Sequence, residues 1–192
     1  MAEKGLETLQ LQFILDNSTW MKPFHIKVCA KDLLPRRNPQ HVRAYIVNTD
    51  NNNQPGQHWV ALFFNGREAI YFDSYGNPPL QPIMTFMENN AERWKMNTLQ
   101  LQSAFSNVCG HYCVFILLHL VRGLSLHTII RRYFDSSNHH QNDLTVKRWF
   151  KNQYGTVYKH VFNPDMNYGQ CCKPKVASHA LSVQFPMYNV CL

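Results

Sequence analysis

Charged residues are scarce in this sequence, and several other features are missing from it. Only 16% of the 192 residues are charged while 45% are hydrophobic, which excludes a disordered chain. The 8 glycines and 10 prolines are too few for a collagen-like chain. The longest apolar run, residues 114–121, is interrupted by His119 and falls far short of the roughly 20 residues that span a bilayer. The length suits one compact domain with no membrane association.

A signal for export is also missing. The N-terminus has neither a basic segment followed by an apolar core nor a small-residue cleavage site. We therefore expect a protein of the cytosol or nucleus that is not secreted. Six cysteines are present, and in those compartments they are reduced thiols by default. Any cysteine with a special role must be identified from its neighbours.

Acidic residues are scarce in the second half of the chain. Residues 97–192 contain 9 Lys or Arg but only 3 Asp or Glu, and the whole chain has a formal net charge of +7. Clustered cations attract polyanions such as DNA by releasing condensed counterions. We therefore formulate the hypothesis of a DNA-binding surface, with a solvated face that only aids solubility as the alternative. The candidate residues are Arg131, Arg132, Lys147, Arg148, Lys151 and Lys159.

The periodicity of apolar residues predicts an α+β fold. At the start of the chain, Leu6, Leu9, Phe13 and Ile14 have helical spacing, which predicts an amphipathic helix over 4–15 that docks on the core through these side chains. The other predicted helices cover 80–94, 109–122, 124–134 and 142–153. Strands are predicted over 42–47, 58–64, 68–73 and 96–101, and a turn and loop over 31–39.

This order of elements predicts one domain over residues 1–162. Its central sheet is expected to be mixed or antiparallel and flanked by helices. Residues 163–192 lose periodicity, so we expect a C-terminal tail that is flexible or separately docked.

The dipeptide Asn65-Gly66 is typical of a two-residue hairpin turn. With that turn, His58 faces Asp73 on the neighbouring antiparallel strand. Opposed side chains project to the same face with Cα atoms roughly 4.5–5.5 Å apart, so imidazole and carboxylate can form a hydrogen bond. The carboxylate fixes the tautomer of the imidazole and favours its protonated form, as a catalytic histidine requires. A structural His–Asp pair is the alternative, and a bulge or longer turn would change the register.

Cys109 begins the most apolar of the predicted helices. A thiol at this position lies at the positive end of the helix dipole, which stabilises the thiolate, so Cys109 is the candidate nucleophile. Gly110 removes a side chain where a substrate backbone can approach closely. A small buried hydrophobic residue is the alternative for Cys109, and it is the preferred interpretation of Cys113. With His111 and His119 these cysteines match no common zinc-site spacing, so no metal is expected.

Four chemically distinct elements follow one another in the sequence. They are His58-Trp59, Asp73-Ser74-Tyr75-Gly76, Gln102 and Cys109-Gly110. Over roughly residues 41–120 this order resembles the adenovirus-type cysteine proteases (adenain), relatives of the SUMO-deconjugating (Ulp-type) proteases. The segment from Asp32 to Pro35 is similar to one in adenain-like proteases of virus-like DNA transposons. The resemblance implies a papain-like site in circularly permuted order.

The resemblance also implies a role for each of these residues. Cys109 would be the nucleophile, and His58 the general base and then the general acid. Asp73 would orient the histidine; adenain has Glu there, and either carboxylate can do so. Gln102 would complete the oxyanion hole with the backbone N–H of Cys109, because a tetrahedral oxyanion needs fixed donors.

Trp59 and Gly110 would contact the substrate in the cleft, with an ordinary core position as the alternative for Trp59. The implied enzyme is a monomeric endopeptidase that cleaves capsid-type precursor proteins of a virus or transposon, in the host nucleus and virion or in the cytoplasm. Its chemistry would need no cofactor. Adenain is activated by DNA and by a viral peptide tethered through an upstream cysteine. No cysteine lies between Cys29 and Cys109, so we expect no such tether at an equivalent site, whereas activation by DNA stays open.

Two other functions fit the same residues. A deconjugase for ubiquitin-like (SUMO-type) proteins would share the site and differ in the surface around it. A catalytically silent module that binds DNA or capsid would use the basic helices instead.

Overall fold

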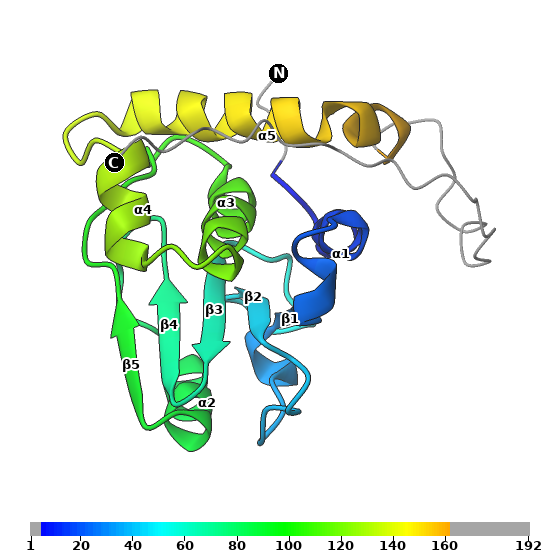
Figure 1. Cartoon of the computed structure of the whole chain (residues 1–192), viewed down its shortest axis with the longest axis vertical. Coiled ribbons are helices and arrows are strands. Elements are labelled where there is room, and N and C mark those ends of the chain that lie inside the picture. The colour runs from blue at the N-terminus through cyan, green and yellow to red at the C-terminus, as the bar shows by residue number, and fades with distance from the viewer. Residues whose placement is uncertain (1–4, 162–192) are drawn as a thin grey trace.

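A computed structural model of the chain describes residues 5–161, with side chains to residue 155. A five-stranded sheet in the order β1-β2-β3-β4-β5 carries helices on both faces (Figure 1). The strands are β1 (Lys27–Ala30), β2 (Ala44–Asn48), β3 (Trp59–Asn65), β4 (Glu68–Phe72) and β5 (Arg93–Met96). The two edge strands run parallel to their neighbours and the inner pairs are antiparallel. The expected mixed α+β sheet is therefore present.

The helices divide between the two faces of this sheet. They are α1 (Thr8–Asn17), α2 (Gln81–Asn90), α3 (Cys109–Val121), α4 (Leu126–Tyr133) and α5 (His139–Val161), with short 3₁₀ turns η1 (Lys22–Phe24) and η2 (Lys31–Leu33). In Figure 1, α5 crosses the upper end of the domain above α3 and α4, while α2 lies at the lower end. Within residues 5–161, no helix is both long and apolar enough to cross a membrane.

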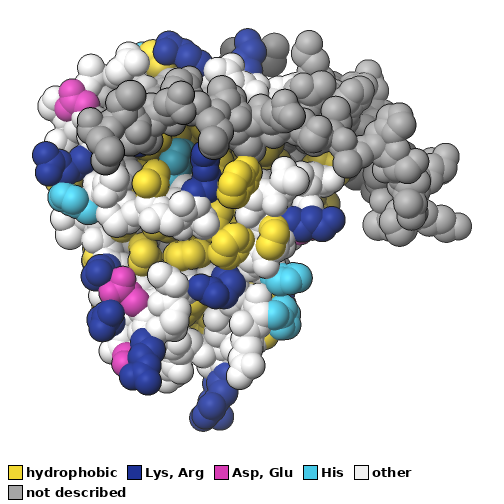
Figure 2. Space-filling model, in the orientation of Figure 1, with side chains coloured by type: hydrophobic (Ala, Val, Ile, Leu, Met, Phe, Trp, Pro, Cys, Tyr) yellow, Lys and Arg dark blue, Asp and Glu magenta, His cyan; other side chains and the backbone are white. Residues whose placement is uncertain are grey.

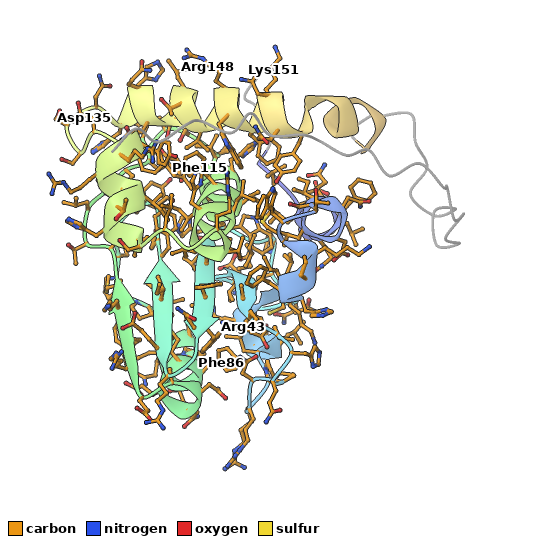
Figure 3. The ribbon with its side chains drawn as sticks, viewed as in Figure 1. Arg43, Phe86, Phe115, Asp135, Arg148 and Lys151 are labelled. Atoms are coloured by element: carbon orange, nitrogen blue, oxygen red, sulfur yellow. The ribbon has the colours of Figure 1, made fainter. Side chains whose placement is uncertain are left out.

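β3 is buried on both of its faces, so it shows no alternation of polar and apolar residues. Trp59, Ala61 and Phe63 belong to one core cluster with α1, α3, α4 and α5. The alternate residues of β3 belong to a second cluster with α2. Figure 3 labels one member of each cluster, Phe115 from α3 and Phe86 from α2. α3 is thereby held against the centre of the sheet, which fixes the position of its first residue, Cys109.

The first helix docks through a face that matches the predicted one only in part, at Ile14. Its buried residues are Leu11, Ile14 and Leu15. Leu9 and Phe13 are 72% and 41% exposed, so the prediction that they face the core is wrong. The helix starts later than predicted, and its core-facing positions follow an i, i+3, i+4 spacing from Leu11. Leu6 is buried, but in the segment before the helix.

Two strands differ from the prediction. β1 lies just before the predicted loop and was not expected. The helix predicted over 80–94 ends at Asn90, and the strand predicted over 96–101 is instead β5, Arg93–Met96. This edge strand has exposed charged residues, and its pairing with β4 and the ion pairs of Arg93 and Lys95 with Glu68 define it. Such contacts are not visible in local periodicity.

The β3–β4 hairpin also has a different turn. Asn65 pairs with Glu68, so Gly66 and Arg67 form the turn, with Gly66 at φ +62°. Glycine at the first central position is typical of a type II′ turn. The predicted register is therefore wrong by two residues. Because side chains alternate along a strand, a shift of two leaves His58 and Asp73 on the same face.

The predicted boundary at residue 162 and the predicted tail over 163–192 lie outside the described residues.

Candidate active site

His58 directly precedes β3 and Asp73 directly follows β4, so both lie at the same end of the central hairpin. Nε2 of His58 is 2.7 Å from Oδ1 of Asp73. The two residues are diagonal neighbours instead of directly opposed, but the hydrogen bond expected from the sequence is present. Asp73 is 3% exposed, so this bond is screened from water on the carboxylate side.

Asp73 is itself held by neighbours that the sequence analysis did not identify. The side chain of Asn97 accepts a hydrogen bond from the backbone N–H of Asp73 (3.0 Å) and donates one to its C=O (2.6 Å). The backbone N–H of Tyr75 donates to Oδ1 of Asp73 (2.8 Å), which is the usual Asx-turn contact two residues on. The turn signal Asp-Ser-Tyr-Gly could have predicted the Tyr75 contact. No local signal connects Asn97 to a residue 24 positions earlier.

Gly76 closes this turn. Its backbone N–H donates to the C=O of Asp73 (2.9 Å), and its φ is +74°. A Cβ atom here would lie 2.8 Å from the backbone carbonyl carbon of Leu99. Glycine is therefore needed both for the dihedral angle and for the close approach of the neighbouring chain.

The thiol of Cys109 is the second partner of His58. Burial by itself lowers the pKa of His58, but hydrogen bonds to Asp73 and Cys109 and the charges of both residues outweigh it and raise that pKa to about 9. Because Nε2 is occupied by Asp73, Nδ1 is the ring nitrogen left for the thiol. The site therefore places an imidazolium beside the sulfur of Cys109 at the N-terminus of α3.

Gln102 comes from the segment between β5 and α3 and is 1% exposed. Its Oε1 accepts a hydrogen bond from the hydroxyl of Ser74 (2.7 Å). Its Nε2 donates to the backbone C=O of Ser106 (2.8 Å) and to the hydroxyl of Tyr75 (3.2 Å). These three bonds fix the orientation of the amide.

His58, Gln102 and Cys109 line one cleft of about 580 Å³, with Asp73 behind the histidine. Its other walls come from the chain at the start of α1, from β1 and η2, and from the polar loop between β2 and β3, together with Tyr75 and residues 106–107. The wall residues include Gly5, Leu6, Glu7, Thr8, Ala30, Leu33, Asn48, Asn51, Asn52, Gln54, Gln57 and Tyr75. The open cleft and its many amide groups suit an extended peptide backbone.

Trp59 lines this cleft and is also part of the core. It is 7% exposed, and its Nε1 donates to the backbone C=O of Leu6 (2.9 Å). Gly110 is not part of the cleft wall. A Cβ at Gly110 would lie 3.2 Å from Cβ of Leu6 and 3.4 Å from Cδ1 of Trp59. The structure therefore places Gly110 against these two side chains.

The candidate DNA-binding residues lie on two helices outside the cleft. Arg131 and Arg132 belong to α4, while Lys147, Arg148 and Lys151 belong to α5. Figure 3 shows Arg148 and Lys151 pointing away from the sheet, and on the face drawn in Figure 2 the Lys and Arg side chains lie at several separate places. The side chain of Lys159 lies outside the described residues.

Cys113 and His119 are buried in the core around α3. Cys113 is fully buried, and burial raises its pKa well above the usual value. Nδ1 of His119 lies 2.8 Å from the backbone C=O of Phe115. Where side chains are described, no group of three or more His, Cys, Asp or Glu could hold a metal ion.

Several viral proteins are similar to part of this sequence, although no family model matches it. A cysteine protease of African swine fever virus is 30% identical over 94 residues, which is 42% of this chain and 34% of that protein. In a second isolate the similar protein, 29% identical over 94 residues, is named a SUMO-1 cysteine protease. A protein of Acanthamoeba polyphaga mimivirus, predicted to be a thiol protease, is 40% identical over 57 residues, 29% of this chain and 19% of that protein.

Two crystal structures of the African swine fever virus protease resemble the fold in part. One has a TM-score of 0.41 at 21% identity and covers 55% of this chain and 43% of that chain. The other has a TM-score of 0.36 at 25% identity and covers 45% and 36%. The chain spans about a third of the length of the curated relatives from this virus. Over less than half of its own length, it is thus similar to proteins named as cysteine or thiol proteases in two viruses.

Proposed function

We propose that this chain is a cysteine endopeptidase of the adenain type that cleaves viral or transposon precursor proteins. The observation that carries the proposal is the 2.7 Å contact between His58 and Asp73 beside a thiol at the start of a helix, all at one open cleft. The similarity to viral cysteine proteases supports the same chemistry.

The reaction is acyl transfer to the thiol. The Cys109 thiolate attacks the carbonyl carbon of the scissile peptide bond, and His58 donates a proton to the amine nitrogen as the C–N bond breaks. Water then attacks the thioester carbonyl while His58 accepts a proton from it, and the thiolate leaves. The His58–Asp73 bond holds the ring in place through both steps, since it fixes Nε2 and leaves Nδ1 for the proton transfers.

Each tetrahedral intermediate carries an oxyanion that needs hydrogen-bond donors. The backbone N–H of Cys109 is available in principle, because the first N–H groups of a helix have no partner within that helix. Gln102 lies on the same cleft with its amide orientation fixed by Ser74 and Ser106. The backbone N–H of Cys109 and the side chain of Gln102 are the two groups that the sequence predicts for the oxyanion hole.

The proposal is tested with the full chain and a panel of extended peptides. Cleavage and labelling by a thiol-reactive peptide probe are expected for the wild type and lost in Cys109→Ala, while His58→Ala strongly slows both. Cys29 serves as an internal control, because it lines the same cleft but burial raises its pKa to about 11 and keeps it protonated. Label found on Cys29 and not on Cys109, or label insensitive to His58→Ala, would favour the silent binding module.

Removal of a ubiquitin-like modifier is the second candidate function. One viral relative is named a SUMO-1 cysteine protease, and such an enzyme would use the same nucleophile. SUMO and ubiquitin fusions offered beside the peptides separate the two: an endopeptidase cleaves the peptides at least as fast, whereas a deconjugase needs the folded modifier.

We also propose that DNA activates the enzyme. The basic residues of α4 and α5 could bind phosphates, in which case duplex DNA raises the peptidase rate at low salt and the effect falls as salt increases. Unchanged rates would end that part of the proposal. The proposal also includes a location in the host nucleus and virion, or in the cytoplasm, which fractionation of infected cells tests. It further includes a monomeric state, which sedimentation tests.

A further inference from the structure

Tyr75 contacts three of the proposed active-site residues at once. Its ring lies against the ring of His58, with centroids 4.9 Å apart and planes at 31°. Its backbone N–H donates to Oδ1 of Asp73, and its hydroxyl accepts a hydrogen bond from Nε2 of Gln102. The residue is half-buried and lines the cleft together with Cys109.

The side chain of Gln102 has no free N–H group to donate to the oxyanion. A primary amide has two N–H groups, and those of Gln102 point to the C=O of Ser106 and to the hydroxyl of Tyr75. Neither is left over for a substrate. The hydroxyl of Tyr75 receives a hydrogen bond, and among the described residues its own O–H has no acceptor.

We infer that the phenol of Tyr75 is a catalytic residue that donates its O–H to the oxyanion, with Gln102 orienting and polarising it. This inference rests on the proposed peptidase function. A hydroxyl that accepts a hydrogen bond becomes a better donor, because chains of hydrogen bonds polarise one another. Gln102 thereby acts through Tyr75, and the backbone N–H of Cys109 is the second donor.

The electrostatics of the cleft keep the phenol protonated, as a donor must be. Burial raises the pKa of Tyr75 above its usual value, and the negative charges of Cys109, Asp143 and Asp73 raise it further. Tyr75 lines the same cleft as Cys109 and Gln102, and its ring packs against that of His58. The inference therefore places the hydroxyl beside the carbon that the thiolate attacks.

Tyr75→Phe tests the inference because it keeps the ring against His58 and removes only the hydroxyl. We expect kcat to fall about 10²–10³-fold, the loss that follows removal of one oxyanion donor, with KM within about threefold of wild type. Alkylation of Cys109 by iodoacetamide should be unchanged across pH, since that reaction forms no oxyanion and needs only the thiolate. Tyr45→Phe is the matched control, because it removes a phenol that donates to Asn38 (2.9 Å) in the other core cluster and should leave kcat unchanged.

The outcomes separate this inference from the proposed function. A Tyr75→Phe enzyme that retains more than a third of wild-type kcat overturns the inference and leaves the peptidase proposal intact. Loss of both cleavage and alkylation also overturns it, since Tyr75 would then only position His58. A wild-type chain that neither cleaves nor shows His58-dependent alkylation contradicts the proposed function itself, and with it the inference.

Discussion

Replacement of Asp73 by Asn removes the charge beside His58 while keeping the shape of the site. Oδ1 of Asp73 accepts hydrogen bonds from the Tyr75 N–H and from the histidine ring, and the amide oxygen of Asn can accept both. At about 4 Å between charge centres and an effective dielectric constant of about 20, the lost attraction is about 4 kcal/mol. An attraction of that size would shift the pKa of His58 by at most about 3 units. An opposite charge commonly shifts a pKa by about 1–3 units.

We therefore expect Asp73→Asn to lower the pKa of His58 by about 1–3 units from its value of about 9. NMR titration of histidine-labelled protein measures this without a substrate, and His58→Gln assigns the resonance. Repeating the titration in a Cys109→Ala background separates the effect of the carboxylate from that of the thiol. In a cleavage assay the alkaline limb should move down by the same amount, because His58 must be protonated to release the amine. A shift below about 0.3 units would refute this account of the site.

Three further predictions follow from the same geometry. Gln102→Ala should lower kcat about 10²–10³-fold without abolishing cleavage, and it should leave alkylation of Cys109 intact; equal loss of both would contradict its role. Asn97→Ala leaves the buried N–H of Asp73 without a partner, while its C=O keeps the hydrogen bond from the Gly76 N–H, and should cost about 1–3 kcal/mol in chemical denaturation; a loss under about 0.5 kcal/mol would show that water or a neighbour replaces the Asn97 amide. The pKa of His58 is raised on folding, so its protonation stabilises the fold fully below pH 6.5, the unfolded value, and this stabilisation is lost as pH rises through about 9. The difference in unfolding free energy between wild type and His58→Gln should fall by about 3 kcal/mol over this pH range. A difference that does not change with pH would contradict the prediction.

Most helices could be predicted from the sequence because their apolar spacing reflects a single buried side. The predicted start of α3 at Cys109 agrees with the structure, since a long apolar run against the sheet leaves few alternatives. α1 shows the limit of such spacing. Leu9 and Phe13 fit a helical stripe but are exposed, because the helix packs on the core through Leu11, Ile14 and Leu15 and only that packing decides which stripe is buried.

The hairpin illustrates a partly correct argument. Asn65-Gly66 correctly indicated a tight turn, but Gly66 occupies its first position instead of its second. The predicted His58–Asp73 contact is nevertheless present, because the register differs from the predicted one by an even number of residues. A shift of one would have placed the imidazole and carboxylate on opposite faces of the sheet.

The sequence by itself determined the chemical groups of the site and their order, because those are properties of residue types: an imidazole, a carboxylate, an amide and a thiol at a helix start. Only the tertiary structure decided how these groups are connected. Asn97 reaches Asp73 across 24 residues, and Tyr75 lies between His58 and Gln102. Hydrogen bonds of this kind depend on the packing of distant segments, which neither periodicity nor local turn chemistry encodes.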